Sequence, residues 1–167
     1  MKVNLGCGLF PREGFVNVDV VKTKGVDIQA DISKKIPLKD NSVDYIYSRM
    51  CLEHVKDFDK AIEEIYRVSK DKTKLKIIVP YYSSYSAYNP DHYNFFTDMA
   101  FNHYADIGHW RKDNKIKLKI DSIKFGFQAF SKFNPLNLIN SVMKHIADKH
   151  TSYYVRLFGH LWPAFDI

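Results

Sequence analysis

Short apolar runs, rich in β-branched residues, alternate with polar and glycine positions through the first 80 residues. Five runs have the length and composition of strands: Val3–Leu5, Phe15–Val18, Val26–Ala30, Val43–Ser48 and Leu75–Pro80. The first three each end in a glycine or polar residue, as parallel strands do where they lead into loops at their carboxyl ends. The pattern predicts a mostly parallel sheet whose loops carry chemistry at one edge.

Two segments have helical spacing. Residues 57–68 place Phe58, Ala61, Ile62, Ile65 and Val68 on one face and charged residues on the other, and Asp57 is the expected N-cap. Residues 135–149 place Leu138, Ile139, Val142, Met143 and Ile146 on one face. Between the fourth run and the first helix, we expect residues 49–55 to form a loop or a short helix.

The pattern is less regular after residue 80. Residues 81–90 predict a tyrosine-rich loop, and a helix is expected around Thr97–Tyr104 with Thr97 as its cap. Ile116–Ile120 alternates like a strand, with Ile123–Phe130 as its hairpin partner. Tyr153–Phe165 is aromatic and apolar without a clear period.

These elements predict one α/β domain over residues 1–167, a Rossmann-like, mostly parallel sheet with helices on both faces. Residues 1–80 would form its cofactor-binding half, and residues 81–167 the half that faces the substrate and completes the sheet. Only ten residues, including Pro11 and Gly14, separate Gly8 from Asp19. A crossover helix needs about ten residues for itself, so we expect the first one to be shortened or absent.

Composition and charge indicate the surface character and the cellular compartment of the protein, but they do not identify its function. The chain is 46% hydrophobic and 26% charged, with a net charge of +6. A solvated lysine-rich surface explains that charge, and a nucleic-acid surface at Lys112–Lys119 is the alternative, which we do not favour. Two cysteines and the absence of a signal segment or an apolar run of membrane length favour a reduced, cytoplasmic protein without a membrane partner. The oligomeric state stays open, and an exposed aromatic tail from Tyr153 would favour a homodimer.

The carboxyl ends of the first three runs carry the candidate chemistry. Gly6-Cys7-Gly8 forms a glycine turn, Asp19 ends the second run and Asp31 ends the third. A glycine turn lets a cofactor approach the backbone, one carboxylate can accept both hydroxyls of a ribose, and the next can reach an adenine edge. A nicotinamide fingerprint would need a third glycine where Pro11 stands, so that class is excluded.

The order of these blocks resembles the class I methyltransferases that use S-adenosylmethionine, in particular the small type 11-like members. The resemblance covers about the first half of the chain. It rests on Val3–Gly8, Asn17–Asp19, Ala30–Ile32, Ile36–Asp44 and Leu52–Val55. It implies that Gly6 and Gly8 line the methionine part of the cofactor, that Asp19 holds the ribose, and that Asp31 with Ile32 holds the adenine. The further residues that we assign to this cofactor site are Asn4, Cys7, Val20, Ser48 and Glu53.

Two features depart from the family pattern. Similar proteins usually carry an acidic residue where this chain has Asn4, which can accept a hydrogen bond but brings no charge. Similar proteins also often continue past a segment like Pro163–Ile167 into a last strand, so we expect that strand to be missing or very short.

The resemblance also points to catalytic candidates. It implies that Glu53 and His54 border the transferable methyl group, and His92 follows the fifth strand on the acceptor side. An acceptor hydroxyl or amine must lose a proton, so His92 is the first candidate for a general base and His54 the second. Tyr81, Tyr82 and Phe95 are the candidates for the acceptor pocket, and a tyrosine-rich loop packed over the sheet is the alternative.

The acceptor itself is not identified. The fourth strand ends in Ser48–Cys51, without the Asn or Asp, proline pair and aromatic residue that hold a flipped base, so a small molecule or glycan is favoured. An inactive cofactor-binding module and a basic nucleic-acid-binding or RNA-modifying protein remain the alternatives. His92, His103 and His109 with Asp98 and Asp106 fit no ligand pattern, so no metal site is predicted.

Overall fold

The computed structural model describes residues 1–105, 116–126 and 136–151. The chain divides into two compact units, and each is described by itself. The first unit contains residues 1–79 and 91–94, and the second contains residues 80–90 and 95–167. The prediction of a single domain over residues 1–167 stays a prediction.

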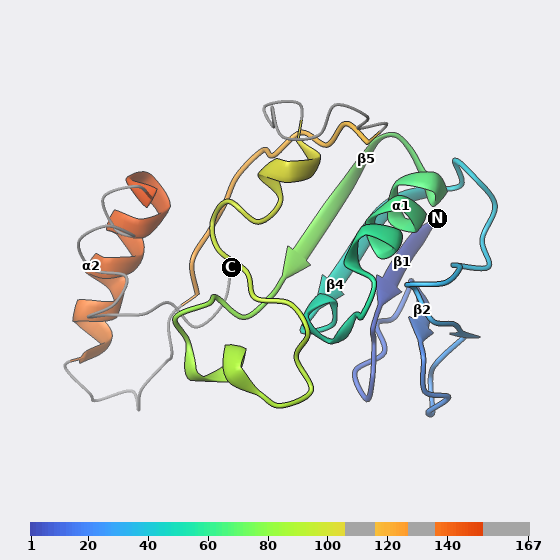
Figure 1. The fold of residues 1–167 in the computed structure, drawn as a ribbon, viewed down its shortest axis with the longest axis horizontal. Helices are drawn as coiled ribbons and strands as arrows, with labels where there is room; N and C mark the ends of the chain where they lie inside the picture. The colour runs from blue at the N-terminus through green and yellow to red at the C-terminus, as the bar shows by residue number, and fades with distance from the viewer. Residues whose placement is uncertain (106–115, 127–135, 152–167) are drawn as a thin grey trace. The chain divides into compact units, whose positions relative to one another are not determined.

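The first unit is built on a five-stranded parallel sheet. Its strands are β1 (Lys2–Leu5), β2 (Val16–Asp19), β3 (Ile28–Gln29), β4 (Val43–Arg49) and β5 (Ser69–Ile78). Their order is β3-β2-β1-β4-β5, with every neighbouring pair parallel, and Figure 1 labels β2, β1, β4 and β5 of this series. The Rossmann-like parallel sheet predicted from the sequence is therefore confirmed. The order reverses between β1 and β4, which places a topological switch point at their carboxyl ends.

The centre of this sheet is buried on both faces. Val3, Asn4 and Leu5 of β1 are all buried, although successive side chains of a strand point to opposite faces. Val18 of β2 and Ile46 of β4 extend the same core. Continuous burial of this kind is typical of the inner strands of a parallel sheet.

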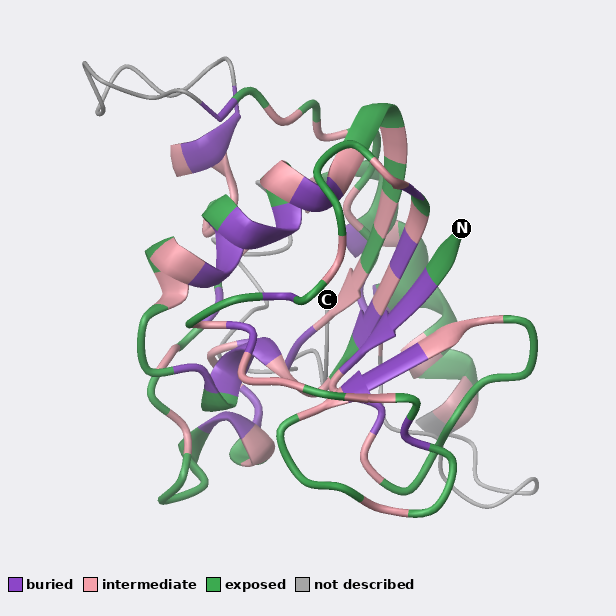
Figure 2. Cartoon of the chain, turned by 90° about the vertical axis from the view of Figure 1, so that its right-hand side faces the viewer, coloured by how far each residue is buried: buried purple, intermediate pink, exposed green. Residues whose placement is uncertain are grey.

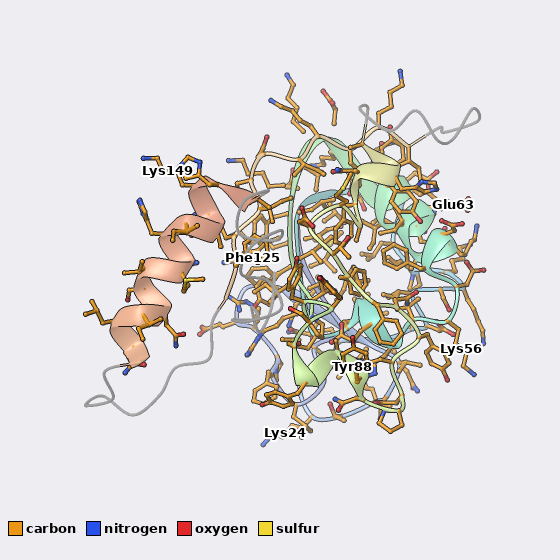
Figure 3. All side chains as sticks on the ribbon, turned by 60° about the vertical axis from the view of Figure 1, so that its left-hand side comes forward. Lys24, Lys56, Glu63, Tyr88, Phe125 and Lys149 are labelled. Atoms are coloured by element: carbon orange, nitrogen blue, oxygen red, sulfur yellow. The ribbon has the colours of Figure 1, made fainter. Side chains whose placement is uncertain are left out.

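Helix α1 (Phe58–Val68) matches its prediction. The Asp57 carboxylate accepts a hydrogen bond from the Lys60 amide at 3.0 Å, which satisfies one of the free amides of the first turn. The buried face of α1 and its exposed, polar face appear as separate stripes in Figure 2, and Glu63 belongs to the polar one (Figure 3). The buried residues of α1 are Ala61, Ile62, Glu64, Ile65 and Val68.

No helix joins β1 to β2, as predicted from the short spacing. The connection is organised by Asn17, which is 6% exposed. Its Oδ1 accepts from the Asn4 side chain at 2.9 Å and from the Arg12 amide at 2.8 Å, and its Nδ2 donates to the carbonyls of Arg12 and Phe15. One buried amide thus ties the loop to β1, where a crossover helix would otherwise stand.

The second half of the sheet differs from its prediction in one respect. A 3-10 helix, η1 (Leu52–His54), follows β4 as expected. Strand β5 begins at Ser69, directly after α1, whereas the sequence predicts it from Leu75. The pairing passes from Val43 with Ser69 to Tyr45 with Lys74, so β5 contains an irregularity, and Lys72 within it has a φ of +63°. Residues 69–74 are polar and lack the apolar run from which a strand is predicted, so the sequence did not indicate this part of β5.

The second unit has a small apolar core of its own. Tyr81, Phe125, Met143 and Ala147 are buried together, and Tyr82, Ile123 and Ile146 pack against them. Helix α2 (Leu136–Lys149) contributes Met143 and Ala147 and confirms the predicted helix. Only part of its predicted apolar face is packed: Leu138, Ile139 and Val142 are exposed.

Two further predictions for the second unit are wrong. The helix expected around Thr97–Tyr104 is a series of turns that ends in the 3-10 helix η3 (Asn102–Tyr104), and η2 (Tyr85–Tyr88) precedes it. Thr97 Oγ1 accepts from the Met99 amide, and amides bond three residues back, so local turn bonds replace the α-helical ones.

The strand expected at Ile116–Ile120 is reduced to one bridge between Leu118 and Ala105. Residues 123–126 form no strand beside it. Residues 127–130 of the expected hairpin, the segment 153–165 and the terminal strand lie outside the described residues, as do Asp106, His109 and Lys112. Within the described ranges, no helix combines the length and the apolar character that crossing a membrane requires.

Candidate functional site

The candidate site lies in the first unit, at the carboxyl ends of β1, β2 and β4. Open α/β sheets bind ligands where the strand order reverses, which here is between β1 and β4. Leu5 of β1 pairs with Ser48 of β4 at this edge, so the loops that follow both strands start side by side.

The first of these loops is the glycine turn. Gly6 has a φ of +65°, a conformation that favours glycine, and its amide donates to the Val18 carbonyl at 2.9 Å. A Cβ atom at Gly6 would lie 2.2 Å from Cys51 Sγ. Glycine is therefore required at this position both for its backbone angle and for the close packing of the loop after β4.

Gly8 and Asp19 connect the ends of β1 and β2. Gly8 has a φ of +52° and no atom within 4 Å of the place where a Cβ would stand. Its amide donates to Asp19 Oδ2 at 2.7 Å, and the Val21 amide donates to Asp19 Oδ1 at 2.9 Å. These bonds fix the half-buried carboxylate and use one acceptor position on each oxygen. Val20, which lies between Asp19 and Val21 in the sequence, is exposed.

Asp31 follows β3 and caps a turn. Its Oδ1 accepts from the Ser33 amide at 3.0 Å and from Ser33 Oγ at 2.6 Å, and Lys34 Nζ lies 3.6 Å from Oδ2. The hydrogen bond from the Ser33 hydroxyl is the main cause that lowers the pKa of Asp31. The neighbouring Ile32 is buried, so this turn presents a charged oxygen beside an apolar core residue.

Asn4 occupies a structural position. It is 3% exposed and donates to Asn17 Oδ1 and, at 3.4 Å, to the Phe10 carbonyl. Its amide group therefore holds the β1–β2 connection. Sequence reasoning named Asn4 for the cofactor and missed the organising role of Asn17, for which an asparagine inside an apolar strand is the available signal.

Two free cysteines lie near the end of β4. Burial is the main cause that raises the pKa of the Cys51 thiol to about 12, and the Glu53 carboxylate adds to it. Burial also raises the pKa of Cys7. Both thiols are therefore protonated at neutral pH, and neither has the low pKa that a nucleophilic cysteine needs. Ser48, next to them on β4, is 1% exposed.

The three residues Glu53, His54 and His92 form one cluster, although the sequence places His92 far from the other two. The rings of His54 and His92 meet edge to face with their centroids 4.6 Å apart. One ligand atom from each of the three side chains lies within 4.8 Å of the others. Sequence reasoning named all three residues but did not predict that they meet.

The predicted acceptor residues belong to the second unit. Tyr81 is fully buried in its core, where it contacts Phe125 edge to face at 5.1 Å. Tyr82 is half-buried, and Phe95 is 54% exposed with its ring 5.6 Å from that of Tyr88. The structure therefore gathers the predicted cofactor residues in the first unit, while the role of these three aromatic residues stays a prediction.

Known proteins resemble this chain in part of its sequence and in its fold. Residues 12–77, less than half of the chain, match the family model described as a methyltransferase domain. A methyltransferase from Archaeoglobus fulgidus, described as dependent on S-adenosylmethionine, is similar in structure over 99% of this chain and 82% of its own, with a TM-score of 0.58 and 16% identity. At that identity the likeness shows the fold alone. No curated protein matches the sequence.

Two other solved structures match smaller parts. The YcgJ protein from Bacillus subtilis aligns over 48% of this chain and 44% of its own, with 21% identity and a TM-score of 0.41. A methyltransferase from Aquifex aeolicus aligns over 54% of this chain and 61% of its own, with 23% identity and a TM-score of 0.42. This chain thus spans less than two thirds of the length of either protein.

Proposed function

We propose that this chain is a class I methyltransferase that uses S-adenosylmethionine, because residues 12–77 match the methyltransferase-domain family model and the fold is that of such an enzyme. We propose that it transfers the methyl group of that cofactor to an oxygen or nitrogen atom of a small molecule or glycan. The observation that carries the proposal is the hydrogen bond between the Gly8 amide and the Asp19 carboxylate, which joins a glycine turn to an acidic strand end at the switch point.

The residues at this edge fit the cofactor. Open space at Gly8 lets a ligand approach the backbone. Asp19 keeps one acceptor position on each oxygen after bonding to Gly8 and Val21, which suits two ribose hydroxyls. We assign the adenine to Asp31 and Ile32, because among the described residues the contact found for Asp31 Oδ2 is the distant Lys34, at 3.6 Å. The remaining residues of the proposed cofactor site are Asn4, Gly6, Cys7, Val20, Ser48 and Glu53.

Bound S-adenosylmethionine supplies a methyl group that its positive sulfur already activates. The protein must then align the acceptor and remove its proton. The His54–His92 pair supports this role, because His54 lies one 3-10 turn beyond Cys51, the residue that packs on Gly6, and the His92 ring meets that of His54. We assign His92 as the first candidate for the general base and His54 as the second.

The acceptor class and the setting are part of the proposal. The segment Ser48–Cys51 has no aromatic residue on which a base could stack, which favours a small molecule or glycan over a nucleobase. Tyr81, Tyr82 and Phe95 remain the acceptor contacts that we propose from the sequence. The two free cysteines support a cytoplasmic setting.

Substitution of Asp19 tests cofactor binding. Asp19→Asn removes the charge but keeps an oxygen that can accept the Gly8 amide. A charged hydrogen bond contributes about 1.5–3 kcal/mol, so we expect the Kd for S-adenosylmethionine to rise about 10- to 100-fold in calorimetric titration. Asp121→Asn, an exposed carboxylate of the second unit, is the matched control and should bind as the native chain does. Equal affinity in all three proteins would remove Asp19 from the site.

Substitution of His92 tests catalysis separately from binding. His92→Ala should lower the rate of S-adenosylhomocysteine formation about 100-fold or more, because a general base contributes about that much, while the Kd for the cofactor stays within about twofold. The assay screens hydroxyl and amine acceptors among small molecules and glycans, with RNA as a further class. Cofactor binding without product from any acceptor would favour an inactive cofactor-binding module.

A further inference from the structure

Glu53 is an unusual residue to find buried. It is 1% exposed, and its Oε2 has no hydrogen-bond partner, the only carboxylate oxygen in that state among the described residues. Burying this oxygen without a partner is costly, because no hydrogen bond at Oε2 replaces the hydration that the oxygen loses. Such a group is expected to face a cation that compensates it.

Two imidazoles are held beside this carboxylate by the backbone. The Glu53 carbonyl accepts from the amides of Tyr93 at 2.7 Å and Asn94 at 3.2 Å. The Asn94 side chain donates to the carbonyls of Leu52 and Val55, at 3.0 and 2.6 Å. These four bonds fasten the segment that carries His92 onto η1, which carries Glu53 and His54. The three side chains are therefore brought together by the fold and not by chance rotamers.

Asp91 lies beside one ring nitrogen of His54. Nδ1 of His54 lies 3.1 Å from Asp91 Oδ2 and 3.3 Å from the Asp91 carbonyl, both of which are acceptors. A proton on Nδ1 is donated to them, which leaves the lone pair of the neutral ring on Nε2. A histidine whose second nitrogen donates to a carboxylate is the usual arrangement of a metal-binding imidazole.

We propose that Glu53, His54 and His92 bind one divalent transition-metal ion, with Asp91 as the residue that orients His54. Two imidazoles and one carboxylate are a ligand set typical of Zn²⁺ and Fe²⁺, whereas Mg²⁺ and Ca²⁺ prefer oxygen ligands. The donor atoms lie within 4.8 Å of one another, and ligands of a tetrahedral ion at about 2.1 Å lie about 3.4 Å apart. The His54 ring, with 42% of its side chain exposed, has room to make that small closure.

Three protein ligands leave coordination positions open on the ion. A role of these open positions in methyl transfer rests on the proposed function. An acceptor hydroxyl bound to the ion loses its proton to water more readily, because the metal stabilises the resulting oxygen anion. That oxygen then bonds to the methyl carbon, and the carbon–sulfur bond breaks with its electron pair left on sulfur. In the metal-loaded protein the two histidines act as ligands, and the metal ion takes the place of a histidine base.

Metal binding is measured first, in the absence of S-adenosylmethionine. The tag-free, chelator-treated chain is titrated with Zn²⁺ by calorimetry and with Co²⁺ by visible absorption, which reports imidazole coordination. We expect one ion per chain with a Kd below about 1 μM. His92→Ala and the isosteric Glu53→Gln should each weaken binding at least about 100-fold, and Asp91→Asn about 10-fold. The matched control is His145→Ala, which removes an exposed histidine of α2 and should leave binding unchanged.

The outcomes separate the metal site from the proposed function. Binding that is absent, or equally strong in Glu53→Gln and the native chain, would overturn the metal site, and a chain that still binds S-adenosylmethionine would then keep the metal-free histidine base. Metal binding without cofactor binding would uphold the site and remove its role in methyl transfer. Product formation that stops in chelator and returns with Zn²⁺ or Fe²⁺ would support both.

Discussion

Gly6 and Gly8 show how two glycines of one turn are required for different reasons. Both have a positive φ, but a Cβ would meet Cys51 at Gly6 and open space at Gly8. The first glycine therefore allows two loops to pack closely, and the second leaves room for a ligand. A motif of two glycines does not by itself distinguish these roles.

Substitution of Gly6 should be more harmful than its backbone angle alone predicts. Gly14→Ala is the matched control, because Gly14 has a φ of +75° and no atom within 4 Å of the position that a Cβ would take. We expect Gly14→Ala to lower the free energy of unfolding by about 1–2 kcal/mol and Gly6→Ala by about 1–3 kcal/mol more, measured by urea denaturation.

The excess cost at Gly6 should depend on Cys51. Cys51→Gly removes both the Sγ and the Cβ that the new side chain would meet. In the double variant we expect Gly6→Ala to cost no more than Gly14→Ala does, and a double-mutant cycle measures the difference. If the cycle gives no coupling between positions 6 and 51, the steric account of Gly6 is wrong.

At the scale of elements, helix α1 is fastened to the loop before β4 by an ion pair between the half-buried Arg67 and the buried Glu64. Arg67 donates to both carboxylate oxygens of Glu64, at 2.8 and 2.7 Å, and to the carbonyls of Ile36 and Leu38. Glu64 also accepts from the Ile36 amide at 2.8 Å. The hydrogen bonds from Arg67 are the main cause that lowers the pKa of Glu64. The pair therefore orders a loop that has no strand or helix of its own.

The Arg67–Glu64 pair should make the free energy of unfolding depend on pH in the acid range. A carboxylate whose pKa is lowered by folding contributes its full stability above the unfolded pKa of about 4.3, and that stability is lost as the pH falls through the folded pKa. Glu64→Gln should lower the free energy of unfolding by about 3 kcal/mol at pH 7, and the gap to the native chain should narrow below about pH 4. Chemical denaturation from pH 7 to pH 3 measures both.

The neighbouring Glu63 supplies the control for this effect. It lies on the exposed face of α1 and pairs only with Lys60 among the contacts described for it. Glu63→Gln should change stability by less than about 1 kcal/mol at any pH, because exposed pairs contribute little. A gap for Glu64→Gln that stays constant down to pH 3 would contradict the ionic account.

The elements that sequence predicted well are those whose local signals agree. In α1, the Asp57 cap and the helical spacing of apolar residues point to the same boundaries. Around Thr97 the expected cap did not start a helix, because the Thr97 side chain accepts the Met99 amide within a turn. The His92 cluster was hidden for another reason. The backbone carbonyls of Leu52, Glu53 and Val55 hold its segment, and a carbonyl that accepts a hydrogen bond leaves no mark in the sequence.

At the scale of the whole molecule, the proposed cofactor residues and the second apolar core belong to different units. Asp19 and the other proposed cofactor residues lie in the first unit, whereas Tyr81, Phe125 and Met143 form the core of the second. The sequence predicts a single domain, which would unfold in one cooperative transition. Scanning calorimetry with and without S-adenosylmethionine tests this directly.

We expect one unfolding transition, whose midpoint temperature rises with the cofactor and falls with a substitution in the second core. S-adenosylmethionine at about 100 times its Kd should stabilise the folded state by about 2.7 kcal/mol and raise the midpoint. Phe125→Ala, which empties part of the second core, should cost about 3–5 kcal/mol and lower that same midpoint, because residues in one cooperative domain share one equilibrium. Two transitions, of which the cofactor shifts only one and Phe125→Ala only the other, would show two domains. In that case the predicted single domain is wrong, and methyl transfer would depend on how the second unit meets the first.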